Sequence, residues 1–471
     1  MPATFLHGVE TIEVPSGYGV ISVVKSAVIA LVGIAPTGDK NVLKLVASPE
    51  DAAQFGSELP GFNIPKALSA IFKQGSGTVL VANVFDTTEH TTQVTAETHA
   101  VTLGKAKLTF APIDEPVITN TGATVTYVKD TDYSIDVFGN ITVIAGSAIV
   151  EGQDILCTYK KLNDAAVTSD EIIGELDALT GARSGMQLFD LAYTLFGFKP
   201  KLLIAPGYST VDAIATEMIV KSNKYRAFSL IDAPEAAIVS DVITARAPGG
   251  DWAGFNGYDK RVIPLYPMIK AYDADSDANI LTPYSQWLAG VIAATDLNFG
   301  YWYSPSNKPI LGIIDTEVPI QFDITDSTSE ANRLNEVGVV TVRSGLKTWG
   351  NRSAGFPNSS EPLTFIAVQR TADIVDESIE FFTDPYLDEP GTPAFVDFIR
   401  ESVNGFIRTL IGRGALLDGS KCIFDPAKNP AAEIALGHYT FTNKYAVPTP
   451  AGRITFEREI DINLYANVNP Q

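Results

Sequence analysis

The order of the apolar segments constrains the fold of this 471-residue chain more than any other feature. A short, fully apolar run at 28–33 is followed by a segment with helical periodicity at 65–73 and by a second apolar run at 78–84. The order strand, helix, strand is typical of parallel strands joined by a crossover helix. The same alternation returns at 187–196, 201–205, 211–223 and 227–231. We therefore expect an α/β domain with a doubly wound sheet, built from 23–90 and 163–358.

Residues 91–162 interrupt this alternation with a different residue pattern. Helical periodicity is absent there, and β-rich pieces such as 124–128, 141–144 and 155–159 are separated by turns containing Asp, Gly and Asn. Short strands with frequent turn residues are typical of a small β-sandwich. Because the α/β pattern resumes after the insert, we expect an outward-facing module that folds by itself.

The segment 359–452 is assigned to an α+β C-terminal domain. It begins with an apolar run at 363–369 that predicts a strand. Its segment 395–411 is the best amphipathic helix of the chain, with apolar residues at spacings of three and four on one face. Near the end of this helix, Arg408 and Arg413 have no acidic residue close by in the sequence. In a chain with 55 acidic and 34 basic residues, this basic helix end is a candidate contact for an acidic neighbour.

Both ends of the chain alternate in polarity without an evident local partner. In 454–466 the even positions are apolar except Arg458, and the odd positions are mostly polar, which is typical of a strand with one buried face. At roughly 3.3 Å per residue this stretch is about 40 Å long, enough to leave its own subunit. The residues 1–22 resemble a second extended arm. For 453–471, an ordinary last strand paired within the same subunit is the alternative.

Charge and cysteine content exclude several classes of partner. The net charge of −21 argues against a surface built to bind nucleic acid or anionic lipid. Cys157 and Cys422 give neither metal-ligand spacing nor a disulfide framework, so we expect buried free thiols and a reducing compartment. The apolar run at 27–35 is far shorter than the roughly 18 residues of a membrane span. The N-terminus also lacks the pattern of a signal peptide.

The common catalytic and cofactor-binding motifs are absent from the sequence. No G-x-x-x-x-G-K-[ST], H-E-x-x-H or G-x-S-x-G occurs. The loop 273–277 begins like a calcium-binding EF-hand loop, but Ala278 and Tyr284 stand where Gly and Glu are required. We therefore predict no metal and no cofactor.

The histidines argue against one class of hydrolase. None of the four lies within 163–355; they are His7, His90, His99 and His438. A Ser-His-Asp triad therefore cannot form within that segment. We predict no catalytic residues, and a hydrolase on an α/β scaffold remains the alternative from a different class.

Several short sequence blocks together resemble the contractile-tail sheath proteins of bacteriophages. Two of them are near the N-terminus, at 6–13 (LHGVETIE) and 27–35 (AVIALVGIA). The others follow in the order of the family, at 289–292, 296, 302–307, 334–335, 338–340, 349–352 and 370–373. Val340 departs from the family, which often has Asn there, and Asn351 and Ser353 stand where it often has Ala and Thr. The resemblance covers nearly the whole chain except the insert.

This resemblance implies a protein without an active site, one of many copies in a helical homo-oligomer of stacked sixfold rings around an inner tail tube. The α/β domain would be similar to the subtilisin fold without its catalytic residues. The terminal arms would donate strands to the sheets of neighbouring subunits, through Glu10, Ile12, Val14, Ile454, Phe456, Ile460, Ile462 and Leu464. The C-terminal domain would lie against the tube, with Arg400, Arg408 and Arg413 facing it.

The resemblance also implies how such a particle works. Sheath contraction would release stored conformational free energy and drive the tube through the host envelope for genome delivery. Baseplate and tail terminator proteins would contact the ends of the sheath. The protein would belong to a virion assembled in the bacterial cytoplasm. The sheath of a tail-derived bacteriocin or of a related contractile injection system is the alternative.

Overall fold

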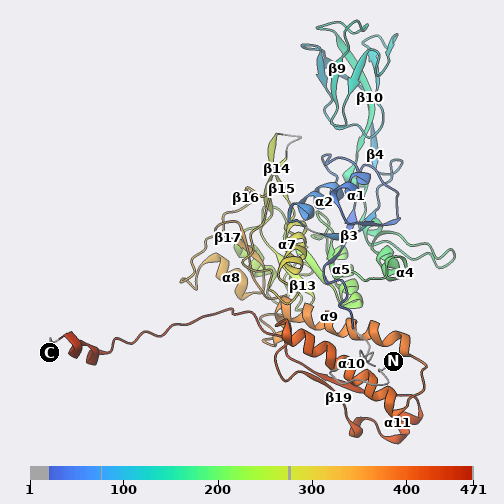
Figure 1. The fold of residues 1–471 in the computed structure, drawn as a ribbon. Coiled ribbons are helices and arrows are strands. Elements are labelled where there is room, and N and C mark those ends of the chain that lie inside the picture. Colours follow the sequence, from blue (N-terminus) through green and yellow to red (C-terminus); the bar gives the residue numbers. More distant parts are fainter. Residues whose placement is uncertain (1–20, 76, 274–276, 469–471) are drawn as a thin grey trace, which may run out of the picture.

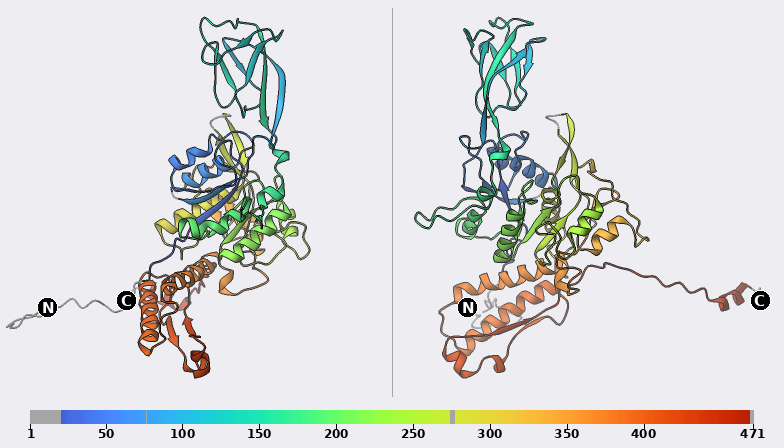
Figure 2. Two further views of the ribbon diagram at one scale, coloured as in Figure 1. Left: turned by 90° about the vertical axis from the view of Figure 1, so that its right-hand side faces the viewer. Right: turned by 180° about the vertical axis from the view of Figure 1, so that it is seen from behind.

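The computed structural model describes residues 21–75, 77–273 and 277–468. Glu10, Ile12 and Val14 lie outside the described residues. The α/β domain occupies the middle of the molecule, with the β-rich insert on one side and a two-helix domain on the other (Figure 1). The last described residues leave the body as a long extended segment (Figure 2).

The central sheet has six strands in the order β13-β12-β11-β1-β3-β2. They are β1 (Val28–Gly33), β2 (Leu43–Val46), β3 (Thr78–Asn83), β11 (Leu202–Ile204), β12 (Phe228–Asp232) and β13 (Val262–Leu265). All neighbours pair in parallel except β2, which is antiparallel to β3. The chain order reverses between β1 and β11, which is the defining feature of a doubly wound sheet. The mixed α/β character predicted from the sequence is confirmed.

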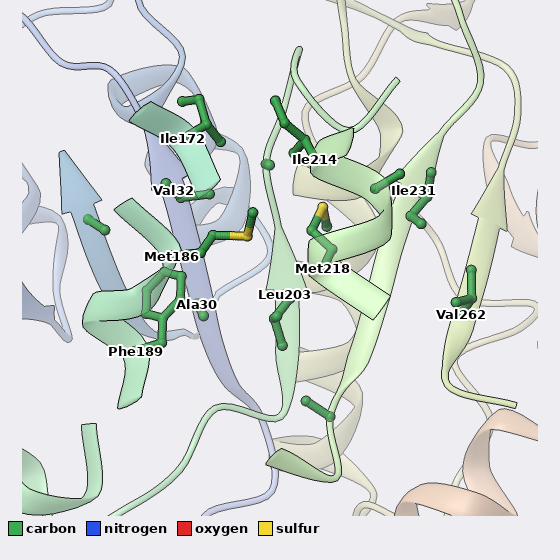
Figure 3. Packing of buried hydrophobic residues seen from close by; sticks show 14 of the residues in the cluster. Ala30, Val32, Ile172, Met186, Phe189, Leu203, Ile214, Met218, Ile231 and Val262 are labelled. Carbon is green, nitrogen blue, oxygen red and sulfur yellow. The ribbon is translucent and has the colours of Figure 1, made fainter. Parts of the chain in front are cut away.

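Helices cover both faces of this sheet because successive residues of β1 point to opposite sides. Ile29 and Leu31 pack under α2 (Ile64–Lys73) and α7 (Tyr284–Asn298). On the other face, Ala30 and Val32 pack with Met186 of the 3-10 helix η3 (Gly185–Leu191) and with Met218 of α5 (Asp212–Tyr225) (Figure 3). The remaining short helices of this domain are α1 (Pro49–Ala52), α3 (Ser169–Ile173), α4 (Ala192–Phe196), α6 (Val239–Ala245) and α8 (Glu330–Glu336).

After β13 the simple alternation of strand and helix ends earlier than the sequence predicted. Two antiparallel pairs replace it, formed by β14 (Ile269–Asp273), β15 (Ala278–Thr282), β17 (Thr341–Arg343) and β18 (Lys347–Trp349). A short strand, β16 (Asp315–Thr316), also pairs with β14. The loop that begins like an EF-hand lies in the sequence between β14 and β15, and its residues 274–276 lie outside the described residues.

The insert forms two sheets around a core of its own. Four strands pair in the order β4 (Thr91–Ala100), β10 (Asp154–Leu162), β6 (Val117–Asn120) and β7 (Thr126–Tyr127). Three more pair in the order β5 (Lys105–Lys107), β9 (Asn140–Val143) and β8 (Tyr133–Ile135). Tyr133, Tyr159 and Ile118 are buried between them. The insert projects away from the α/β domain (Figure 1).

The C-terminal domain contains two long helices, α9 (Ile366–Thr383) and α10 (Pro393–Gly412). A hairpin of β19 (Lys421–Phe424) and β20 (Phe441–Lys444) packs beside α10. The connection between its two strands contains α11 (Ala431–Ala435). The predicted strand at 363–369 is wrong, because the chain forms a 3-10 turn at Pro362–Thr364 and then α9. The first turns of α9 are buried on every side, so their apolar run lacks the one-sided helical period that reveals a surface helix.

Up to residue 468, the last one described, the C-terminal segment forms no strand after β20. Residues 448–461 have no regular secondary structure, and Ile462–Val468 is a 3-10 helix. The alternative of an ordinary last strand paired within the same subunit is therefore wrong for the described residues. An extended segment without a sheet beside it has no ladder of hydrogen bonds to hold it in a strand.

We predict that the insert is dispensable for the fold of the remaining chain. Asn163 N donates to His90 O over 2.9 Å, so the two ends of the insert lie together and a short Gly/Ser linker closes the gap left by deleting 92–161. Calorimetry of this variant should give a cooperative transition close to that of the wild type. Loss of cooperative melting would contradict an independently folded insert.

Candidate subunit-contact surfaces

The C-terminal arm, defined as 453–465, presents an apolar surface to solvent. Its large apolar side chains have exposed fractions between 64% and 90%; they are Ile454, Phe456, Ile460, Ile462, Leu464 and Tyr465. The hydrogen bonds found in the arm are local, such as Asn463 N to Asp461 Oδ1 at 2.9 Å. Burying one such side chain contributes about 1.5–3 kcal/mol. A contiguous exposed strip of this kind marks an interaction surface.

The hairpin of the C-terminal domain has one covered edge and one open edge. The Asn404 side chain of α10 covers β19, accepting from Cys422 N at 2.8 Å and donating to Cys422 O at 3.0 Å. Because Cys422 faces Asn404, it and its opposite residue Asn443 form a non-hydrogen-bonded pair. The backbone groups of Asn443, and of Phe441 two residues earlier, therefore point away from β19.

The open edge belongs to β20. Among the described residues, the backbone N–H groups of Phe441 and Asn443 have no partner. The buried Oδ1 atom of Asn443 also lacks a hydrogen bond within the described ranges. An edge strand with unpaired backbone groups is a template for pairing with another strand.

An aromatic groove of about 470 Å³ adjoins this edge. It lies between the start of α10 and the loop that leads into β20, and its apolar lining includes Tyr386, Leu387, Phe395, Ile399, Tyr439 and Phe441. Asp388 and Glu389 add negative charge to its lining. The groove offers space for apolar side chains of a strand placed beside β20.

The three predicted arginines of α10 differ in their surroundings. Arg400 is half-buried and pairs with Asp397 at 3.0 Å and Glu401 at 3.2 Å, so its charge is largely neutralised within the subunit. Arg408 and Arg413 are exposed and form no ion pair in the part of the chain that the structure describes. Their charge remains available to a partner.

The switch point of the central sheet, where doubly wound folds commonly bind ligands, is occupied by a side chain. Asn63 accepts from Ile34 N at 2.8 Å and donates to Pro206 O at 2.7 Å, which joins the chain after β1 to the chain after β11. A Cβ atom on Gly33 would lie 2.2 Å from Asn63 Oδ1, so glycine is required for this close approach. The residues of the crevice thus hold two loops together.

A buried cluster of Asp232, Ser209 and Ser285 lies at the end of β12. Asp232 accepts from Ser285 N at 2.7 Å, from Ser285 Oγ at 2.6 Å and from Ser209 Oγ at 3.2 Å. Burial raises the pKa of Asp232 to about 6, although these donors oppose the shift. All three side chains are buried. The cluster joins the loops after β11 and β12 to the start of α7.

The two thiols are buried, and the possible metal ligands form contacts within the chain. Cys157 and Cys422 are free and buried, and burial raises the pKa of each thiol, to about 12 and about 11 respectively. One group of three possible metal ligands occurs in the described ranges, formed by Glu89, His90 and Glu171. His90 uses both ring nitrogens within the chain, since Nδ1 accepts from Asp86 N at 3.0 Å and Nε2 lies 2.8 Å from Glu171 Oε1.

No helix within the described ranges combines the length and the apolar character needed to cross a bilayer.

Sequence reasoning missed two features of these surfaces. The open edge of β20 was missed because four residues are too few for a clear alternating pattern. The polar residues Arg370, Asp373, Glu377 and Glu380 of α9 were missed because the start of this helix was predicted to be a strand. Their spacing of three, four and three residues places them on one face of a helix, and was the available signal.

Comparison with known proteins gives a consistent result. Residues 181–352 match the family model for the phage tail sheath protein central domain. The chain is 41% identical over 468 residues to the tail sheath protein of Burkholderia phage BcepMu, covering 98% of each chain. It is 31% identical to a putative prophage major tail sheath protein of Pseudomonas aeruginosa, over 61% of this chain and 72% of that protein.

Solved structures resemble the whole fold at low sequence identity. The sheath complex of the PVC extracellular contractile injection system, in its contracted state, has a TM-score of 0.61 at 16% identity, covering 98% of this chain and 100% of that chain. The contracted helical sheath of the anti-feeding prophage has a TM-score of 0.61 at 17% identity, with the same coverage.

We predict that Asp232→Asn changes the pH dependence of stability. The unfolded carboxyl has a pKa of about 3.9, so between pH 4 and 6 the folded state binds more protons and the wild type loses stability as the pH rises. The variant cannot titrate here, and its stability relative to the wild type should rise by about 2 kcal/mol across this window. Urea unfolding at several pH values measures this difference, with the exposed Asp418→Asn as control. Parallel curves for wild type and Asp232→Asn would contradict the shift.

Proposed function

The chain belongs to the phage tail sheath protein family, and from this premise we propose that its copies are linked into a helical sheath by exchange of terminal strands. It is a structural subunit of a contractile sheath, in a virion or a tail-derived particle. The observation that carries the proposal is that one subunit has both an exposed apolar arm and an unpaired strand edge.

Strand exchange would bury the apolar arm and pair the open edge of β20. A donated arm placed beside β20 pairs with the backbone groups of Phe441 and Asn443 and covers the aromatic groove with alternate side chains. Four residues of a strand span about 13 Å, so pairing with β20 uses only part of the arm. The rest of the arm bridges the distance between subunits. The N-terminal residues Glu10, Ile12 and Val14 are proposed as a second donor.

We propose that the C-terminal domain faces an inner tail tube. The support is the pair of exposed arginines, Arg408 and Arg413, in a chain with a net charge of −21. An acidic strip on the tube would attract these side chains. Arg400, which is paired within its own subunit, would contribute less.

Contraction would proceed by movement of whole subunits between two lattices, with the arms keeping neighbours connected. The free energy would come from better contacts in the contracted state, so that the chain needs no cofactor. The ends of the sheath would contact baseplate and tail terminator proteins, and the particle would assemble in the bacterial cytoplasm. Delivery of a phage genome is favoured by the BcepMu protein, which matches over 98% of each chain. A bacteriocin or injection-system sheath is the alternative.

We predict that deleting 453–471 abolishes polymerisation and leaves the subunit folded. The apolar side chains of the arm are exposed in the single chain, so their removal takes little from its core. The truncated protein should remain a soluble monomer with a near-normal Tm, measured by light scattering and calorimetry. Aggregation or unfolding would instead indicate that the arm stabilises its own subunit.

Point substitutions give a matched test of the same arm. Ile460→Asp with Ile462→Asp places charges on the apolar side chains and should prevent sheath formation, as seen by electron microscopy. Thr455→Asp with Asn463→Asp adds the same charge at polar positions and should preserve it. Wild-type sheaths formed by the first variant would refute the arm as the link.

We predict that Arg408→Glu with Arg413→Glu weakens co-assembly with the inner tube. Rising salt should weaken attachment of the wild type in parallel, because exposed charges are screened over about 10 Å at 0.1 M ionic strength. Co-sedimentation of sheath and tube protein measures the effect, with Lys105→Glu and Lys107→Glu in the insert as control. Equal tube binding by both variants would assign the helix end to another surface.

A further inference from the structure

Helix α9 contacts the α/β domain through apolar side chains, such as Ile366 in the core under α7, and through one polar face. Arg370, Asp373, Glu377 and Glu380 of this face each form an ion pair with a residue of the α/β domain. Three of the pairs are largely buried, with exposed fractions of 3% for Arg370, 6% for Asp373 and 3% for Glu377. We call these three pairs the ion-pair interface.

The ion-pair interface attaches α9 to the ends of separate core elements. Arg370 makes two hydrogen bonds with Asp296 in the last turn of α7, at 2.9 and 2.6 Å. Asp373 accepts two bonds from Arg261, which directly precedes β13, at 2.5 and 2.6 Å. Glu377 pairs with Lys201, which directly precedes β11. The contacts are therefore spread along about two turns of the helix.

Helix α9 also contacts the two chain segments that lead to the terminal arms, one before β1 and one after β20. Arg370 donates to Ser26 O at 2.9 Å, and Ser378 Oγ accepts from Val24 N at 3.2 Å, which fixes the segment before β1. On the C-terminal side, Tyr445, which directly follows β20, donates to Asp376 Oδ1 at 2.9 Å. Ile21 and Val447 are buried in the hydrophobic cluster that contains Val375 of α9.

Buried ion pairs of this kind serve orientation more than stability. Removing two charges from water costs about as much free energy as their attraction returns, and apolar replacements of similar size are often equally stable. Two-pronged Arg–carboxylate pairs are nevertheless directional, because both hydrogen bonds require one relative position of the two groups. Apolar contacts carry no such directional requirement.

We propose that the ion-pair interface of α9 is an orientation lock, which fixes the α/β domain relative to the roots of both arms. This inference rests on the proposed strand exchange. A force applied to either arm is transmitted to α9 and, through the ion pairs, to the central sheet. A subunit with this lock moves as one body when the lattice changes. The exposed pair of Arg226 and Glu380, at 2.8 Å, lies on the same helix and contributes little to the lock.

The test replaces buried ion pairs by apolar pairs in the full-length chain. The variant carries Lys201→Met, Glu377→Leu, Arg261→Met, Asp373→Leu, Arg370→Met and Asp296→Leu, which replaces all three pairs. Spin labels at Ser240→Cys in α6 and Thr409→Cys in α10 report the distance between the two domains, and the native cysteines are buried. The wild type should give one narrow distance distribution. The variant should keep or raise its Tm and give a distribution roughly twofold broader or more.

A matched control and a separate readout make the result specific. Arg226→Met with Glu380→Leu removes the exposed pair of the same helix and should leave the distribution narrow. A narrow distribution in the six-substitution variant would overturn the proposal. So would unfolding of both this variant and Lys201→Met with Glu377→Leu alone, since the ion pairs would then provide stability. Sheath formation, scored by electron microscopy of the same samples, tests strand exchange independently.

Discussion

Within the described residues, one edge of β20 pairs with no other strand, and the apolar side chains of the arm stay exposed. In the proposed strand exchange each of these parts would complete the other. Asn404 covers one side of the hairpin and leaves Phe441 and Asn443 of β20 open. The arm keeps Phe456 90% exposed. Unpaired strand edges and exposed apolar strips both favour association with another chain. The β20 edge requires a partner strand and the arm requires an apolar surface, and association between subunits would provide both.

The rest of the structure connects the β20 edge and the arms to the α/β domain. The doubly wound sheet is packed on both faces, and at its switch point Asn63 joins two loops. The buried ion pairs of Arg370, Asp373 and Glu377 connect this body to the helix from which both arm roots are held. The β-sandwich stands outside these connections, joined to the α/β domain next to His90 and Asn163. These features are consistent with the proposed lattice subunit, in which the arms would link neighbours and the ion pairs would orient the core.

The sequence predicted the parts of the fold whose patterns are local. The strand at Val28–Gly33 and the helices α2, α7 and α10 follow from periodicity, and the structure confirms them. The start of α9 was predicted wrongly, because a helix buried on all sides has the same composition as a buried strand. The alternating arm predicted a strand, which the single chain does not form, because a strand depends on a partner outside the local sequence. Pairs such as Arg261 and Asp373 are 112 positions apart, and no local pattern indicates them.

The most direct test identifies what the arm touches in an assembled sheath. A photo-crosslinking phenylalanine analogue replaces Phe456, and sheaths are assembled from an equal mixture of normal and ¹⁵N-labelled chains. Mass spectrometry then separates links between two chains from links within one. The account predicts mixed-isotope links from position 456 to the groove and to β20, at residues such as Tyr439 and Phe441. Links confined to single chains, or links to other surfaces, would contradict strand exchange.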